Sequence, residues 1–385
     1  MINTADRLNK ISEYYFSKKL KEIEDLNKQG KQVINLGIGS PDLPPHPDVI
    51  KTLNEESAKP GNHAYQSYRG SPVLRKAMSD WYKQWYNVEL DPETEILPLI
   101  GSKEGVVHIC MTYLNPGDKV LVPNPGYPAY RSAVYLTGAD CIDYDLVEEN
   151  SWFPDFDFLE SLDLTSVKMM WINYPQMPTG QLPTIEFFEK IIAFGLKHKI
   201  LICHDNPYSF ILNDTPLSLL SIAGAKETAV ELNSLSKSHN MAGWRIGLIA
   251  GKPKFINDVL RFKSNMDSGM FLPLQLAAAK ALSLPREWYN EVNDVYRSRR
   301  EKVFELLTKL NCSFSKSQAG MFVWAKLDDK ETDCYSFVDK ILNEANVFIT
   351  PGGIFGSAGN RYIRVSLCTT VEKFEEAIKR IGAAI

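Results

Sequence analysis

The 385-residue sequence lacks the features that would place it in several large classes of protein. No uninterrupted apolar run approaches the ~18 residues that a membrane-spanning helix requires, so we expect no membrane span. The first ten residues lack the apolar stretch of a signal peptide. The formal net charge of −4 offers no general attraction to nucleic acid or to an acidic membrane surface. Any anion-binding site must therefore be local.

The sequence has only six cysteines. They are widely scattered, and none forms a Cys-x-x-Cys pair. This spacing argues against a zinc site and against a disulfide framework. We therefore expect no metal site, and we expect buried, reduced thiols in a cytoplasmic protein.

From about residue 95, apolar runs typical of strands alternate with amphipathic stretches typical of helices. The strand-like runs span residues 95–99, 119–122, 167–172, 200–203, 229–232 and 245–250, and the helical stretches span 103–114, 185–197 and 255–264. Such alternation predicts an α/β fold with a mainly parallel sheet covered by helices on both faces. In sheets of this kind, ligands gather at the carboxyl ends of the strands.

The pattern changes after residue 285, where it becomes typical of a smaller α+β unit. Its predicted elements are helices over 288–310, 335–344 and 371–381 and strands over 321–326 and 362–367. A helix over 11–30 and a strand over 33–36 begin the chain, and we expect this segment to join the smaller unit. The predicted domains are therefore residues 46–283 for the large one and residues 1–45 with 284–385 for the small one.

One lysine lies in a serine-rich turn after the strand-like run 229–232. The segment 234–247 reads Ser-Leu-Ser-Lys-Ser-His-Asn-Met-Ala-Gly-Trp-Arg-Ile-Gly, with Lys237 among three serines and Arg245 eight positions later. An amine attacks a carbonyl best in its neutral form, which poor solvation or a neighbouring cation favours. Hydroxyls and an arginine fork suit a bound phosphate. A solvated polar loop is the alternative, and Gly-Trp-Arg-Ile-Gly at 243–247 weighs against it.

Two further segments carry chemistry. The run Ile-Leu-Ile-Cys-His-Asp-Asn-Pro-Tyr at 200–208 places Asp205 at a strand's carboxyl end and Tyr208 three residues later. A carboxylate beneath a pyridine nitrogen keeps that nitrogen protonated, although an N-cap aspartate explains the residue equally well. The run Leu-Ile-Gly-Ser-Lys-Glu-Gly at 99–105 leads from a strand into a helix, and the N–H groups at such a helix start bind phosphate.

Together these segments resemble the class I/II aminotransferases of fold-type I, the aspartate aminotransferase-like group. The resemblance covers nearly the whole chain, and the lysine segment 234–247 is its most specific part. The turn at 101–105 and the tail at 351–366 add to it. The motifs look most like those of the alanine and LL-diaminopimelate aminotransferase branches. The resemblance implies the fold-type I architecture and pyridoxal 5′-phosphate as the cofactor.

The resemblance also implies a role for each site residue. Lys237 would hold the cofactor as a Schiff base and move a proton, Asp205 would pair with the pyridinium nitrogen, and Tyr208 would bond the 3′ oxygen. The substrate α-carboxylate would pair with Arg364 through a bidentate fork and contact the backbone of Gly39. The other implied cofactor contacts are Tyr127, which stacks on the ring, and the phosphate-binding residues Gly101, Ser102, Lys103, Ser234, Ser236 and Arg245.

A homodimer follows from Tyr65, which lies five residues before Gly70 and matches the tyrosine that reaches the phosphate of the other subunit. The segment 263–271 resembles a loop contributed to the partner. Tyr14, Tyr15 and Phe16 would cover the site from the N-terminal helix. Interface and core packing explain these last two features equally well.

The chain departs from the family at one position. The family usually reads Asn-Pro-Thr-Gly where this chain reads Met-Pro-Thr-Gly at 177–180. Met177 cannot donate the hydrogen bond that the asparagine gives to the 3′ oxygen and the substrate carboxylate. Asn173, which we count among the cofactor-binding residues, or Gln176 would have to reach in instead. A lost donor costs ~1–3 kcal/mol if its partner is left unpaired, so Arg364 would carry more of the carboxylate binding.

Transamination is the leading functional hypothesis, with an amino group moving from an L-amino acid such as alanine, aspartate or glutamate to a 2-oxo acid. A pyridoxal-phosphate-dependent C–S lyase, which eliminates at the β-carbon, would use the same residues. A non-catalytic regulatory protein on this scaffold is a third reading. The segment before residue 33 is too short for a DNA-binding domain, which argues against that reading.

Overall fold

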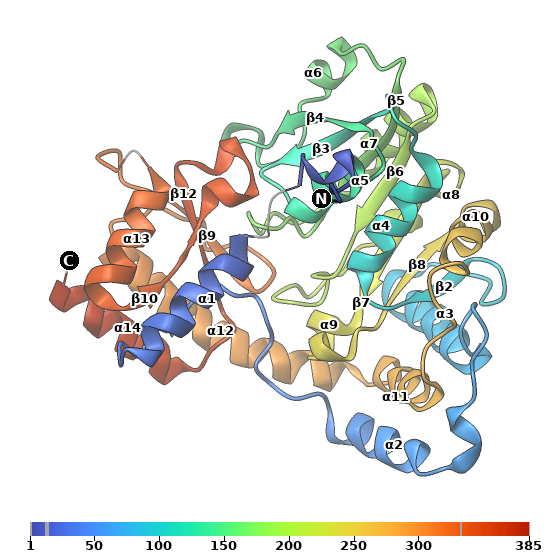
Figure 1. Ribbon diagram of the computed structural model, residues 1–385, viewed down its shortest axis with the longest axis horizontal. Coiled ribbons are helices and arrows are strands. Elements are labelled where there is room, and N and C mark those ends of the chain that lie inside the picture. Colours follow the sequence, from blue (N-terminus) through green and yellow to red (C-terminus); the bar gives the residue numbers. More distant parts are fainter. Residues whose placement is uncertain (1, 12–14, 332, 385) are drawn as a thin grey trace.

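A seven-stranded sheet forms the centre of the larger part of the chain (Figure 1). The computed structural model describes residues 2–11, 15–331 and 333–384. In spatial order the strands are β2 (Ile96–Leu99), β8 (Gly247–Gly251), β7 (Ala229–Ser234), β6 (Leu201–Asp205), β5 (Val167–Ile172), β3 (Lys119–Asn124) and β4 (Asp140–Asp145). Only β8 runs against its neighbours, and the remaining pairs are parallel. The predicted α/β fold with a mainly parallel sheet is confirmed.

The reversal of β8 brings two distant turns to one edge of the sheet. Gly247, the first residue of β8, is in register with Leu99 at the end of β2 and with Ser234 at the end of β7. A Cβ at Gly247 would lie 2.8 Å from the backbone nitrogen of Ser102. The turn that carries Lys237 and the start of the helix after β2 therefore meet at this edge.

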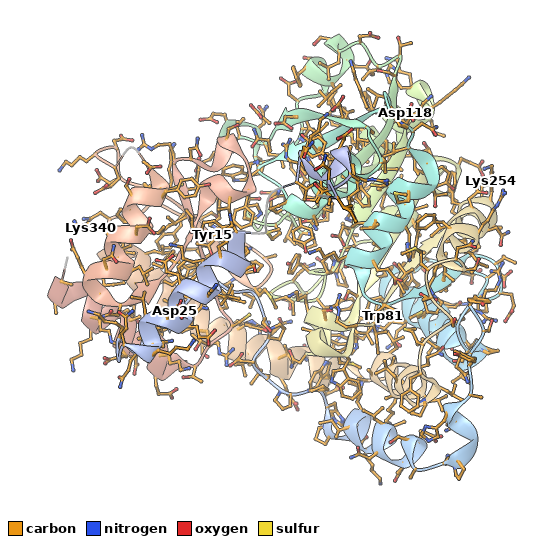
Figure 2. The ribbon with its side chains drawn as sticks, in the orientation of Figure 1. Tyr15, Asp25, Trp81, Asp118, Lys254 and Lys340 are labelled. Carbon is orange, nitrogen blue, oxygen red and sulfur yellow. The ribbon has the colours of Figure 1, made fainter. Side chains whose placement is uncertain are left out.

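Helices cover both faces of the sheet, and successive residues of a strand enter opposite cores. In β5, Met169 and Trp171 belong to one buried cluster, and Met170 and Ile172 belong to the other. Trp81, labelled in Figure 2, lies in the same cluster as Met170. Because both faces are covered, the strands β5, β6, β7 and β8 are buried over nearly their whole length.

The helices, in chain order, are α1 (Tyr15–Lys28), α2 (Pro47–Ser57), α3 (Pro72–Tyr86), α4 (Ser102–Tyr113), α5 (Pro128–Leu136), α6 (Phe156–Ser161), α7 (Ile185–His198), α8 (Ala225–Thr228), α9 (Leu235–Ser238), α10 (Pro253–Lys263), α11 (Leu272–Leu282), α12 (Arg286–Lys309), α13 (Cys334–Ala345) and α14 (Val371–Ala384). Short 3-10 helices are η1 (Asp6–Leu8), η2 (Pro60–His63), η3 (Glu148–Asn150), η4 (Leu219–Ser221), η5 (Ala242–Trp244), η6 (Gly352–Phe355) and η7 (Ser357–Gly359). No helix within the described ranges is long and apolar enough to cross a membrane. The cytoplasmic location that the cysteines suggest stays a prediction.

A smaller group of elements combines the two ends of the chain (Figure 1). Strands β11 (Thr350–Pro351), β12 (Tyr362–Ser366) and β9 (Phe322–Lys326) form an antiparallel sheet in that order. Strand β1 (Ile34–Asn35) pairs in parallel with β10 (Val347–Phe348). Ile23 of α1 packs in a cluster with Leu342 and Phe348. The N-terminal segment therefore lies on C-terminal elements, whereas the predicted boundaries at 45/46 and 283/284 stay predictions.

Candidate active site

A cavity of about 650 Å³ lies at the carboxyl ends of the parallel strands. Twelve of the fourteen predicted site residues line it, namely Gly39, Ser102, Lys103, Tyr127, Asn173, Asp205, Tyr208, Ser234, Ser236, Lys237, Arg245 and Arg364. The lining also includes Phe16, Ser17, Leu20, Ile38, Tyr130, Met177, Pro207, Ala242, Phe322 and Phe355. The fold thus brings together segments separated by more than 300 residues. Gly101 and Tyr65 are not among the lining residues.

Lys237 lies in α9, the single helical turn that follows β7. Its Nζ donates a hydrogen bond of 2.5 Å to the carbonyl oxygen of Gly39. Burial lowers the pKa of Lys237 to about 8, with the Arg364 and Arg245 cations acting in the same direction and Cys368 opposing them. About a tenth of this amine is therefore neutral at pH 7, far more than for an ordinary lysine, and the neutral form is the one that a nucleophilic lysine requires.

Asp205 is the last residue of β6 and is 4 % exposed. Its Oδ2 accepts a hydrogen bond of 2.8 Å from the hydroxyl of Tyr130, whereas its Oδ1 has no partner among the described residues. Burial raises the pKa of Asp205 to about 6, although the Tyr130 hydrogen bond and the nearby His204 lower it. An unpaired buried oxygen is costly, so Oδ1 suits a donor inside the cavity such as a protonated ring nitrogen.

Tyr130 is a site residue that the sequence analysis missed. It lies in the first turn of α5, three residues after Tyr127 at the N-cap, and the two rings meet edge-on with 5.5 Å between centroids. The Tyr130 ring stacks on Trp171 with 4.9 Å between centroids, and its hydroxyl reaches Asp205. The spacing of the two tyrosines was the available signal, and it depended on a helix that was not predicted.

The start of α4 and the turn after β7 form an end of the cavity suited to an anion. Ser102 begins α4, so N–H groups of its first turn have no partner within the helix. The hydroxyls of Ser234 and Ser236 lie 2.9 Å apart. Gly101 allows the guanidinium of Arg245 to lie against the turn, because any Cβ at Gly101 would collide with it. Hydroxyls, helix N–H groups and a guanidinium are together the donors that a phosphate takes.

Arg364 also lines the cavity; it lies in the middle of β12 and is 4 % exposed. Its Nη2 donates to the carbonyl of Gly37 at 2.8 Å, and its Nη1 donates to the sulfur of Met177 at 3.3 Å. The guanidinium carbon lies 3.8 Å from the centre of the Phe322 ring and 4.6 Å from that of Phe355. The predicted carboxylate-binding arginine is therefore buried, and aromatic rings surround it.

The amide side chains of Asn173 and Gln176, in the loop after β5, hydrogen-bond to backbone atoms. Asn173 donates from Nδ2 to the backbone carbonyl of Asp205 at 2.6 Å and accepts from the Met177 N–H at 2.8 Å. Gln176 donates to the Pro125 carbonyl and accepts from the Thr179 N–H. Both carboxamides are thus engaged with backbone, and neither takes over from the asparagine that Met177 replaces. Binding of the cofactor by Asn173 stays a prediction.

Tyr65 lies outside the cavity and is 91 % exposed. A Cβ at Gly269 would meet the backbone oxygens of Gln66 and Ser67 at 2.8 Å. The segment 263–271 therefore lies directly against the residues that follow Tyr65, and both were predicted to serve a second subunit. That prediction stays open.

The N-terminal helix lines the cavity with Phe16, Ser17 and Leu20. Tyr15, labelled in Figure 2, packs edge-on against Phe16 and Tyr335. Tyr14 lies outside the described residues.

The comparisons with known proteins identify one family. Residues 31–381 match the family described as aminotransferase class I and II. The LL-diaminopimelate aminotransferase of Dehalococcoides mccartyi strain CBDB1 is 40% identical over 380 residues, 98% of each chain. The LL-diaminopimelate aminotransferase of Aquifex aeolicus is 38% identical over 383 residues, 99% of each chain. The structure of substrate-bound BacF from Bacillus subtilis has a TM-score of 0.94 and 36% identity, covering 100% of this chain and 98% of that one.

Proposed function

We propose that this chain, which belongs to the class I and II aminotransferases, works in the cavity between Asp205 and Arg364 with Lys237 as its reactive amine. The chain is a pyridoxal-phosphate-dependent aminotransferase, which moves an amino group between an L-amino acid and a 2-oxo acid. The observation that carries the residue assignment is the unpaired, buried Oδ1 of Asp205 in the same cavity as a lysine of lowered pKa.

The cofactor, when bound, supplies the electron sink for the bond changes at the amino acid's Cα. Asp205 is placed to accept a hydrogen bond from the ring nitrogen through Oδ1, while Tyr130 fixes the orientation of its carboxylate through Oδ2. Lys237 acts as the nucleophile and carries the proton. The hydroxyls of Ser234 and Ser236, the start of α4 and Arg245 hold the phosphate.

Arg364 holds the substrate α-carboxylate in this proposal. A carboxylate oxygen is a much stronger acceptor than a thioether sulfur, so a bound carboxylate takes the Nη1 donor from Met177. Phe322 and Phe355 limit the access of water to the guanidinium, which strengthens its attraction for an anion. The two ends of the cavity, one for phosphate and one for carboxylate, thereby orient the amino acid above the ring.

The lining near Arg364 supports a donor with an apolar or aromatic side chain. The Arg364 side chain is contacted by the rings of Phe16, Phe322 and Phe355 and by the sulfur of Met177. An apolar side chain gains ~25 cal/mol for each Å² that it buries against such a surface. LL-diaminopimelate is the second candidate, because the two curated relatives carry that name.

The half reaction tests both parts of the proposal. Enzyme loaded with pyridoxal phosphate is mixed with one amino acid and no 2-oxo acid, and the absorbance of the bound cofactor is followed. The panel comprises L-phenylalanine, L-leucine, L-alanine, L-aspartate, L-glutamate and LL-diaminopimelate. We expect the largest change with L-phenylalanine or L-leucine. A change with LL-diaminopimelate alone would select the second candidate, and no change with any donor would contradict the proposal. Pyruvate and ammonia released from cystathionine without a 2-oxo acid would indicate a C–S lyase instead.

We also propose a homodimer in which Tyr65 of each chain serves the phosphate of the other. Tyr65 is 91 % exposed, and the adjoining segments carry exposed Tyr68, Met266 and Phe271. Apolar side chains gathered on one surface are typical of an interface. Light scattering of the loaded enzyme should give twice the mass of the chain, and Tyr65→Phe should weaken phosphate retention without changing that mass. A fully active monomer would contradict the dimer.

A further inference from the structure

A closed polar cluster lies under the cavity, inside the core, and centres on His204 and Glu231. The two residues are in register on the neighbouring strands β6 and β7, and each is 0 % exposed. His204 Nδ1 lies 2.8 Å from Glu231 Oε2, and His204 Nε2 lies 2.9 Å from the carbonyl oxygen of Tyr174. Charged side chains are rarely buried this completely, so the cluster requires an explanation.

Both ring nitrogens of His204 face acceptors. A backbone carbonyl has no hydrogen to donate, and a carboxylate has none either. A neutral imidazole carries a single N–H, so it would leave one nitrogen lone pair opposite an oxygen lone pair in a site closed to water. Only an imidazolium donates from both nitrogens and satisfies both contacts.

The hydrogen bonds of Glu231 decide which partner holds the proton. A neutral histidine beside a protonated Glu231 is the competing arrangement. The two carboxyl oxygens of Glu231 already accept from the Tyr82 hydroxyl at 2.8 Å, the Leu219 N–H at 2.8 Å and the Ser218 hydroxyl at 2.9 Å. Three donors beside the histidine stabilise the ionised carboxylate, and they leave the proton on His204.

The Tyr174 carbonyl connects this cluster to the cavity. Tyr174 follows Asn173, whose side chain donates to the Asp205 carbonyl, and it precedes Met177, whose sulfur contacts Arg364. His204 itself is the chain neighbour of Asp205 and points to the opposite face of the sheet. The His204 ring therefore contacts the loop 173–177 at Tyr174, and that loop contacts the backbone of Asp205 and the side chain of Arg364.

We propose that His204 is a positioning residue whose imidazolium form, donating from both ring nitrogens, fastens the loop 173–177 to the sheet and places a positive charge next to Asp205. The role of the loop in catalysis rests on the proposed function, whereas the charge of His204 does not. The groups that face the ring are Glu231 on β7, the Tyr174 carbonyl and the ring of Phe188 on α7, 5.2 Å away.

Nitrogen NMR of the wild-type holoenzyme labelled with ¹⁵N-histidine tests the charge directly. His204→Gln identifies the His204 signals by their loss. We expect both ring nitrogens of His204 to carry a bonded proton at neutral pH. A single protonated nitrogen at neutral pH would overturn the proposal. This result is independent of turnover, so it stands even if no amino donor is found.

Kinetics of His204→Gln test the positioning role. Glutamine retains a donor for the Tyr174 carbonyl but removes the charge. We expect kcat/KM to fall by about 10–100-fold, as a displaced site would cause. We also expect the acidic limb of the kcat pH profile to move to higher pH, because Asp205 then keeps its proton longer. A lowered Tm with an unmoved profile would reduce His204 to a packing residue and overturn the positioning role.

A matched control is His198→Gln. His198 also pairs with a glutamate, since its Nε2 lies 3.0 Å from Glu160 Oε2, but that pair is near the surface at the end of α7. The same substitution there should leave kcat/KM and the pH profile unchanged. Equal effects of the two substitutions would also overturn the proposal.

Discussion

The guanidinium of Arg364 donates a hydrogen bond to the sulfur of Met177 across 3.3 Å. A thioether accepts weakly and cannot donate, so this contact holds Arg364 in place without competing strongly for its donors. Met177 therefore presents a sulfur and no side-chain hydrogen-bond donor beside Arg364. Twelve of the fourteen predicted site residues line the same cavity.

Restoring the amide by Met177→Asn should strengthen carboxylate binding. We expect KM for the preferred donor to fall by about tenfold, which corresponds to ~1.4 kcal/mol. Met177→Leu keeps an apolar side chain but removes the sulfur, and it should leave KM within about twofold. Initial-rate kinetics of both variants provide the measurement. An unchanged KM in Met177→Asn would show that the lost donor had no role in this chain.

Arg364→Lys replaces the arginine fork by a single ammonium group. This change should weaken substrate binding and leave cofactor binding unchanged. We expect KM for the donor to rise by about 10–100-fold, because a charged bidentate pair contributes ~1.5–3 kcal/mol. The absorbance spectrum of the bound cofactor should stay the same. Arg361→Lys is the matched control, because Arg361 lies nearby but bonds to Asp328 and Asp329 at the surface. Loss of the cofactor in Arg364→Lys would contradict the assignment.

The buried carboxyl of Asp205 predicts a pH-dependent stability in the cofactor-free protein. Its pKa is raised from 3.8 to about 6 by burial, so the folded state binds the proton more tightly than the unfolded state. Stability is then fully retained below pH 4 and falls as the pH rises to 6. At pH 7.5, Asp205→Asn should therefore be more stable than wild type by about 3 kcal/mol. Urea unfolding at pH 4 and pH 7.5 measures this, and an equal gain at both pH values would argue against the ionisation of Asp205 as its cause.

The lowered pKa of Lys237 predicts the pH dependence of cofactor uptake. Cofactor-free enzyme should bind pyridoxal phosphate covalently at a rate that rises with pH and levels off above about pH 8, because the neutral amine is the reacting form. Mass spectrometry after borohydride reduction measures the attachment. Lys237→Ala should abolish it, whereas Lys316→Ala, at an exposed loop, should not. Attachment that persists in Lys237→Ala would contradict the assignment.

The elements that the sequence predicted were those with strong periodicity and two covered faces. The strand at 167–172 was predicted with its observed bounds, because Met169 to Ile172 are apolar without interruption. The strand β4 was missed, since its residues Asp-Cys-Ile-Asp-Tyr-Asp lie at an exposed edge and alternate with charges. Helix α5 was missed as well, because it is short and rich in aromatic residues. Local pattern predicts an element only where burial enforces that pattern.

The same limit applies to the cavity. Lys237 and Asp205 could be predicted because their chemistry lies in contiguous segments with a recognisable order. Tyr130, His204 and Glu231 could not, because their meaning depends on how α5 lies on the sheet and how β6 and β7 align. Strand register brings residues 27 positions apart into contact, and no short segment carries that information.

The reversal of β8 has one more consequence, which concerns tolerance to mutation. Gly247 pairs with both β2 and β7. Because it has no side chain, β7 and the first turn of α4 can lie close together at this point. Even a methyl group there would press on the Ser102 nitrogen from behind. We therefore expect a substitution at Gly247 to displace the first turn of α4, which is part of the proposed phosphate site. The expected result is weaker binding of the cofactor in a protein that still folds.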